Sequence, residues 1–156
     1  MNIRVRQFFS PLEPRIALLA YIFFGHICIP FRIQGASMEP TYANGGVNFC
    51  WTFHYRFAQP KHGDVVAIRL AGGKIMLLKR IVAREGEWVE FRNGKLWVDG
   101  KEIDEPYVRY PCRWNLTPRQ VAVRCVYVVG DNRDIPMEQH YFGQASIQRI
   151  MGVPLW

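Results

Sequence analysis

Long apolar runs, clustered charges, internal repeats and metal-ligand spacings are scarce or absent in this sequence. The net charge of +7 comes from 20 Lys and Arg against 13 Asp and Glu, but the cations are scattered singly, which argues against a nucleic-acid-binding surface. The four Cys and four His show no paired ligand spacing, so we expect neither a metal site nor a cofactor. The 156 residues, 49% of them hydrophobic, indicate one domain with an ordinary core.

The longest apolar run is Ile16–Phe31, which carries no formal charge. Its 16 residues fall short of the ~20 that usually cross the hydrocarbon layer, and His26 and Pro30 weaken it further. Because it is almost entirely apolar on every face, we predict a membrane span, with a buried core helix and a cleaved signal peptide as the alternatives. The chain is then divided into a short basic N-terminus (1–15), a transmembrane anchor (16–31) and one further domain (32–156).

The three arginines among residues 1–15 favour a cytoplasmic N-terminus, which would put residues 32–156 on the far side of the membrane. The excess of basic charge is also suited to a modest attraction to anionic lipid headgroups. The far side is oxidising in bacteria, where disulfides form. Cys112 and Cys125 flank a polar segment that a bridge would staple, so the sequence allows either a Cys112–Cys125 disulfide or two buried free thiols.

Most of the chain after residue 42 has the pattern of strands and turns. Two-residue turns at Asn93-Gly94 and Asp99-Gly100 predict a meander, and no long amphipathic helix is evident. We therefore predict a mostly β protein, in which an N-terminal transmembrane helix is followed by an antiparallel barrel-like β domain. The predicted strands are VNFCW (47–51), VVAIRL (65–70), KIMLLKRIVA (74–83), EWVEFR (87–92), KLWV (95–98), KEI (101–103) and VAVRCVYVV (121–129).

Ser37 lies in the stretch FRIQGASMEPTY (31–42), where the apolar run ends. Gly35 and Ala36 leave little bulk before the serine, and Pro40 restricts the backbone after it. This pattern indicates a tight turn with an exposed hydroxyl. Such a turn can carry either an incidental surface serine or a nucleophile.

Lys79 lies on the apolar face of a predicted strand. Alternation puts its side chain on the face of Leu77 and Ile81, while Arg80 points to the opposite face. Desolvation lowers the pKa of a lysine, and a shift from ~10.4 to ~7–8 corresponds to about 4 kcal/mol. Lys79 is therefore either a neutral amine in an apolar site or a snorkelling cation near a strand end.

Ser37 and Lys79 together suggest a serine–lysine dyad, in which a neutral amine takes the hydroxyl proton. A Ser-His-Asp triad is the alternative, because His54, His62 and His140 are available. None of the three histidines occurs in a pattern of known triad geometry, so we interpret them as surface residues.

Four short motifs follow one another along the chain: GASMEPT (35–41), GDVVAI (63–68), KRIVAREGE (79–87) and GDNRDIPMEQHYFG (130–143). They resemble, in order, the conserved boxes of the bacterial type I signal peptidases, and an N-terminal apolar segment precedes them as in that family. Each box alone is weak, but the four together cover most of the chain. The eukaryotic and archaeal relatives have histidine at the lysine position, so Lys79 resembles the bacterial type.

The resemblance implies a single-pass, membrane-anchored serine endopeptidase that removes signal peptides on the outer face of the bacterial cytoplasmic membrane. Its partners would be membrane lipid and precursor proteins, which it would bind as an extended strand and cut after an Ala-x-Ala-like site. Ser37 matches the family nucleophile and Lys79 its general base, with the Ser37 N–H as one oxyanion donor. Met38 and Pro40 match the loop that shapes the site, and Gly35 stands where some members carry a second, side-chain oxyanion donor.

The last box departs most from the family pattern. Pro136, Glu138 and His140 occupy the places of a serine near the lysine and of an aspartate–arginine pair. Asp131 and Asn132 keep the pattern and are expected to support the site. With these departures the sequence resembles the shorter family members that process pilin or conjugation-apparatus precursors. It also suits a catalytically silent assembly factor of a secretion or conjugation complex.

Overall fold

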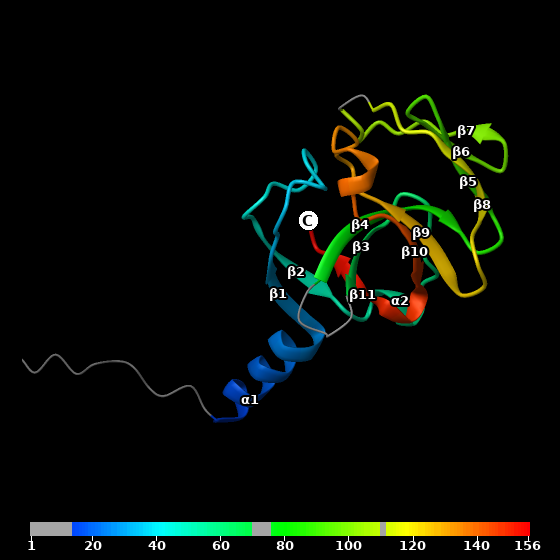
Figure 1. Ribbon diagram of the computed structural model, residues 1–156. Coiled ribbons are helices and arrows are strands. Elements are labelled where there is room, and N and C mark those ends of the chain that lie inside the picture. The colour runs from blue at the N-terminus through cyan, green and yellow to red at the C-terminus, as the bar shows by residue number, and fades with distance from the viewer. Residues whose placement is uncertain (1–13, 70–75, 110–111) are drawn as a thin grey trace, which may run out of the picture.

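The computed structural model describes residues 14–69, 76–109 and 112–156. Most of the basic N-terminal segment and the turn expected at residues 71–73 lie outside the described residues. Strands dominate the described residues, as predicted, and they form two antiparallel sheets (Figure 1). The larger sheet has seven strands, in the order β1 (Cys28–Arg32), β2 (Val47–Trp51), β11 (Ile150–Pro154), β3 (Val65–Arg69), β4 (Met76–Arg84), β9 (Cys125–Val129) and β10 (Gly143–Ser146). The smaller sheet has four, in the order β7 (Lys101–Glu102), β6 (Lys95–Val98), β5 (Trp88–Arg92) and β8 (Leu116–Gln120).

The predicted span 16–31 is divided between a helix and a strand. Helix α1 (Pro14–Ile22) continues as a π-helical turn, η1 (Phe23–Ile27), and the chain then enters β1, so the end predicted as helix is strand. Pro30 accounts for this change, because proline cannot continue a helix and is tolerated on an edge strand such as β1. In the part of the chain that the structure describes, no helix is long and apolar enough to cross a membrane.

The predicted meander is confirmed in the smaller sheet. Asn93 and Asp99 both have φ of 50°, and the glycines that follow them have φ of 83° and 73°, which is the left-handed pair of a two-residue hairpin turn. A Cβ on Gly94 would also overlap the backbone carbonyl of Cys112, so this turn needs glycine for space as well as for conformation.

Other strand predictions were incomplete. The strand predicted over 121–129 begins only at Cys125, because the chain turns at Arg124, whose φ is 57°. Strands β8, β10 and β11 contain Pro or Gly, and their apolar and polar residues show little alternation, so they were not predicted from the sequence. They form because they pair with neighbouring strands. The structure also contains a short helix, α2 (His54–Phe57).

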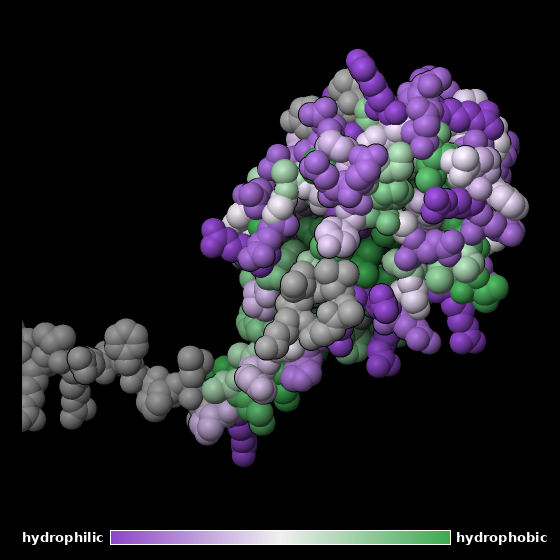
Figure 2. Space-filling model, in the orientation of Figure 1, coloured by the Kyte–Doolittle hydropathy of each residue, from purple (hydrophilic) through white to green (hydrophobic). Residues whose placement is uncertain are grey.

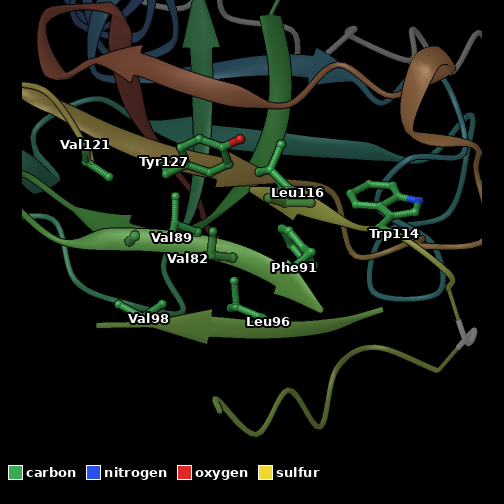
Figure 3. Packing of buried hydrophobic residues seen from close by; sticks show 11 residues of the cluster. Val82, Val89, Phe91, Leu96, Val98, Trp114, Leu116, Val121 and Tyr127 are labelled. Atoms are coloured by element: carbon green, nitrogen blue, oxygen red, sulfur yellow. The ribbon is translucent and has the colours of Figure 1, made fainter. Parts of the chain in front are cut away.

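Strand β4 contributes to all three hydrophobic clusters of the protein. The largest cluster lies between the two sheets (Figure 3) and contains Val82, Ala83, Val89, Phe91, Leu96, Val98, Trp114, Leu116, Val121, Tyr127 and Val129. Leu78 belongs to a second cluster with Ile33, Met38, Cys50 and Ala67, and Ile81 to a third with Val66, Ile68, Val126 and Val128. The middle of β4 is therefore buried.

Cys112 and Cys125 are free thiols in the structure, with no disulfide between them, and both are half-buried rather than buried. Cys112 lies beside the smaller sheet, where its Sγ donates a hydrogen bond to the Gly94 carbonyl at 3.2 Å. Cys125 begins β9 of the larger sheet and pairs with Ser146 of β10. The two thiols are thus held by different sheets.

Candidate active site

The structure brings Ser37 and Lys79 together. Ser37 lies in the turn that follows β1, and Lys79 lies in the middle of β4. A hydrogen bond joins Lys79 Nζ to Ser37 Oγ across 2.6 Å. Lys79 is only 2% exposed, whereas Ser37 is partly accessible, so the buried amine approaches a hydroxyl that a substrate can reach.

The environment of Lys79 shifts its equilibrium toward the neutral amine. Burial lowers the pKa of its ammonium from 10.5 to about 8, and the carboxylate of Asp131 acts in the opposite direction. Among the described residues, Ser37 is the one hydrogen-bond partner of the amine. An uncharged lysine next to a serine hydroxyl can accept its proton.

The loop after β9 holds the serine turn in place. The backbone N–H of Asn132 donates to the Ser37 carbonyl at 3.1 Å, and its side-chain Nδ2 donates to the Ala36 carbonyl at 3.1 Å. A Cβ on Gly130 would overlap the Ser37 carbonyl oxygen, so only glycine permits this close approach. The loop expected to support the site is therefore in direct contact with it.

A buried ion pair lies on the other face of β4. Asp131 is fully buried and accepts two hydrogen bonds from Arg80, Nε to Oδ1 at 2.8 Å and Nη2 to Oδ2 at 2.6 Å. Thr41 Oγ1, just after the serine turn, donates to Asp131 Oδ2 at 2.5 Å. The Arg80 guanidinium also lies over the ring of Tyr107, 3.9 Å from its centroid. This pair connects β4, the serine turn and the loop after β9.

A second ion pair continues the network. Arg133 donates from Nη1 and Nη2 to Glu105 at 2.9 and 2.6 Å, and from Nε to the Gly130 carbonyl at 2.8 Å. Neither ion pair was predicted from the sequence, and neither was the need for glycine at position 130. One signal was available, because Arg80 and Arg133 each lie within a motif and next to a residue already assigned to the site.

His140 is not a surface residue, which corrects the interpretation made from the sequence. It is 6% exposed, packs 4.9 Å from Trp114, and neither ring nitrogen has a hydrogen-bond partner among the described residues. Burial lowers its pKa to about 4, aided by the charges of Lys79 and Arg133. His62, by contrast, is exposed and contacts Glu87 at 2.7 Å. Neither histidine is hydrogen-bonded to Ser37.

Two unpaired strand edges flank the dyad. β1 is an edge strand, and β9 pairs with β4 only from Arg80 onward, which leaves Met76–Lys79 without a neighbour on that side within the described ranges. A hollow of about 20 Å³ lies between these edges, enough for little more than a water-sized group. Its lining is Phe31, Arg32, Ile33, Gln34, Gly35, Ser37, Met38, Met76, Leu77 and Leu78.

The remaining site predictions are placed as follows. Met38 is buried beneath the turn, in the cluster that contains Leu78. Gly35 is exposed and has φ of 90°, and Pro40 is exposed at the end of the turn. No group of three or more His, Cys, Asp or Glu side chains suited to a metal occurs among the described residues. A larger hollow, about 680 Å³ beside the 3-10 helix η2 (Met137–Gln139), contains neither Ser37 nor Lys79.

Residues 13–155 match a protein-family model described as "Signal peptidase, peptidase S26". The chain belongs to the signal peptidase family. The family resemblance that the four motifs indicated is therefore confirmed, and the match covers nearly the whole chain. A family assignment leaves open the role of each residue, which rests on the geometry above.

Relatives of this signal peptidase family member include chloroplast and bacterial proteins. It is 30% identical over 145 residues to thylakoidal processing peptidase 1 of Arabidopsis thaliana, covering 86% of this chain and 43% of that protein. It is 29% identical over 154 residues to the probable signal peptidase I-1 of Synechocystis sp., covering 94% and 79%. The chain thus spans about two-fifths of the two thylakoidal peptidases that it matches.

A solved signal peptidase I from Enterococcus faecalis has a similar fold. The TM-score is 0.51 at 23% identity, and the match covers 62% of this chain and 97% of that one. This likeness agrees with the mostly β, antiparallel architecture that the sequence predicts.

Proposed function

We propose that this protein is a membrane-anchored serine endopeptidase that cleaves signal peptides from exported precursors, with Ser37 as nucleophile and neutral Lys79 as general base. The observation that carries the proposal is the 2.6 Å contact between Ser37 Oγ and a lysine amine that is 2% exposed. A silent assembly factor would have no need of a buried amine, which destabilises the fold unless it is neutral.

The reaction follows from these two groups. Lys79 Nζ takes the Ser37 proton as Oγ attacks the scissile carbonyl, which gives a tetrahedral intermediate and a lysine ammonium. The ammonium returns the proton to the leaving amine as the C–N bond breaks, leaving an acyl-serine. Water then attacks the ester while the Lys79 amine accepts a proton from it. The resulting ammonium gives that proton to Ser37 Oγ as the carboxylic acid of the signal peptide departs.

The backbone around Ser37 is suited to stabilising the intermediate. The Ser37 N–H donates no hydrogen bond to another described residue, so it is available to the developing oxyanion. Gly35 supplies no side-chain donor. We assign Asn132 and Asp131 as positioning residues, because the first is bonded to the serine turn and the second ties that turn to β4 through Thr41.

The substrate binds as an extended strand between β1 and the first half of β4. Both edges have free backbone groups there, so a peptide can hydrogen-bond to each of them. The hollow between them is small, which admits an alanine methyl and excludes larger side chains. The family resemblance implies cleavage after an Ala-x-Ala-like site, and the small hollow is compatible with the alanine next to the bond.

The N-terminal helix provides the membrane contact. Helix α1 extends away from the β domain (Figure 1), and hydrophobic side chains gather around it (Figure 2). Leu18, Leu19 and Tyr21 are exposed by 59%, 66% and 69%, which is costly in water and favourable in lipid. The peptidase domain then works on the outer face of the bacterial cytoplasmic membrane. Pilin or conjugation precursors are one specialised substrate class within this proposal.

The test is coexpression of the wild type or Ser37→Ala with candidate secreted precursors, followed by sequencing of the product N-termini. We expect new N-termini after Ala-x-Ala-like sites with the wild type and uncleaved precursors with the variant. If the biological function of the protein survives Ser37→Ala, it is an assembly factor and the proposal is wrong. Efficient cleavage after large residues at both the first and third positions before the bond would overturn the strand-binding arrangement.

Topology is tested separately in intact spheroplasts. External protease should reach the C-terminal domain, and alkaline carbonate should leave the chain in the membrane pellet. Protection from external protease alongside a cytoplasmic control, or release by carbonate, contradicts the proposed orientation.

A further inference from the structure

We propose that a second hollow, beside Lys79, binds an acidic side chain of the substrate at the first residue after the scissile bond. This inference rests on the proposed peptidase function and adds a charge preference to it. The carboxylate would be held by Arg69 and Arg149, which lie at the rim of the hollow.

The hollow adjoins the dyad. Its volume is about 170 Å³, and Lys79 forms part of its wall. Leu77 lines both this hollow and the smaller one at Ser37, so the two lie next to each other along β4. The floor is largely apolar and suits the methylene stem of an acidic side chain. Its apolar lining residues are Ile68, Leu77, Val128, Phe142 and Ala145.

The charge of the hollow is one-sided. Arg69 ends β3 and Arg149 ends the 3-10 helix η3 (Ile147–Arg149), and both are exposed. Neither forms an ion pair with a carboxylate within residues 14–69, 76–109 and 112–156, and no Asp or Glu lines the hollow. Tyr141 adds a neutral hydrogen-bonding group at the same place. A carboxylate would meet two unpaired guanidinium groups there.

The chemistry of the dyad tells which substrate residue reaches this hollow. The Lys79 ammonium must give its proton to the leaving nitrogen, which belongs to the first residue after the bond. Side chains alternate along an extended peptide, so when the residue before the bond enters the small hollow at Ser37, the first residue after the bond points to the opposite face. Lys79 lines the second hollow and not the smaller one, so we place this side chain in the second hollow.

The experiment uses the purified full-length protein in neutral detergent and peptides that differ only at the first residue after an Ala-x-Ala site, with Glu, Gln or Lys. We expect kcat/KM for the Glu peptide to exceed that for the Gln peptide roughly fivefold at low salt and less at high salt. Arg149→Gln should reduce the ratio towards one, and Arg149→Glu should invert it in favour of Lys. Arg119→Gln, an equal charge change on β8 of the other sheet, is the matched control and should leave the ratio unchanged.

Each outcome bears on the proposal. A Glu/Gln ratio near one in the wild type overturns it while leaving the peptidase function intact, since the Gln peptide is still cleaved. A preference that appears only when the acid stands two residues before the bond also overturns it. If the dependence on Arg149 is absent in detergent and appears only when the assay is repeated in anionic vesicles, Arg149 contacts lipid and the proposal is overturned. Failure to cleave any of the peptides contradicts the proposed function and this inference with it.

Discussion

The two faces of β4 carry adjacent cations with opposite environments. Lys79 has one hydrogen-bond partner among the described residues, and burial lowers its pKa to about 8. Arg80 donates two hydrogen bonds to Asp131 and one to the Gly63 carbonyl, and it stacks on Tyr107. A buried cation left without a counterion becomes a base, whereas one with a counterion becomes a structural link.

Removing the unpaired cation should affect activity and spare the fold. In Lys79→Met we expect kcat/KM to fall by at least ~10³-fold, because methionine cannot accept the serine proton. Thermal unfolding should show an unchanged or higher Tm, since the variant removes a buried amine and keeps most of the apolar volume. Lys79→Arg should be equally inactive, because a guanidinium stays charged. Wild-type-like cleavage by Lys79→Met would refute the dyad, and a large loss of stability would make Lys79 a structural cation.

Removing the paired cation should have the reverse effect on stability. Arg80→Met leaves the fully buried Asp131 without its counterion, and we expect the free energy of unfolding to fall by about 3–5 kcal/mol in urea denaturation. Arg80→Lys should lose less, because a lysine keeps the charge but not the two-bond geometry or the stacking. The double variant Arg80→Met/Asp131→Leu should recover much of the loss. If it is no more stable than Arg80→Met, the pair is not the source of the effect.

The pH dependence of activity and of stability should reveal the lowered pKa of Lys79. Below pH 8, kcat/KM should fall about tenfold per pH unit, because the ammonium form of Lys79 cannot act as a base. Between pH 8 and 10.5 the unfolded chain binds more protons at this residue than the folded chain does, so the stability contributed by Lys79 rises with pH across that window. Comparing pH-dependent unfolding of the wild type with Lys79→Met isolates this contribution. A kinetic limb near pH 10 would mean that burial does not perturb the amine.

His140 is a third buried basic side chain, after Lys79 and Arg80. Its pKa is about 4 when folded and 6.5 in the reference state, so the unfolded chain binds more protons between these values. Stability should therefore decrease by roughly 2–3 kcal/mol as the pH falls from 6.5 to 4. His140→Phe suits the surrounding aromatic rings and should remove this dependence, as measured by denaturant unfolding at several pH values. An unchanged pH profile in the variant would assign the acid sensitivity to other groups.

Features that depend on local chain geometry could be predicted from the sequence. The Asn-Gly and Asp-Gly turns fixed two hairpins, and alternation correctly put Lys79 and Arg80 on opposite faces of a strand. The tight turn around Ser37 was also evident from its small residues and proline. In each case the relevant neighbours lie within a few residues, so the sequence carries the whole signal.

Features that depend on strand order could not be predicted. Arg80 meets a carboxylate 51 residues away, and Arg133 meets one 28 residues away, across connections that no local pattern specifies. The burial of His140 depends on Trp114, which comes from another part of the chain. The start of β1 was missed because an apolar stretch can equally face lipid or a sheet. Cysteine spacing likewise could not show that the two thiols belong to different sheets.

Ser37 is synthesised well before the residues that hold its turn. The Ala36 carbonyl accepts a hydrogen bond from a side chain 96 positions further along, and the close approach at Gly130 also needs the end of β9. A nascent chain that already contains both Ser37 and Lys79 therefore lacks the loop that fixes the serine. Any activity that depends on the Ser37 turn therefore requires the chain to be synthesised and folded at least as far as Asn132.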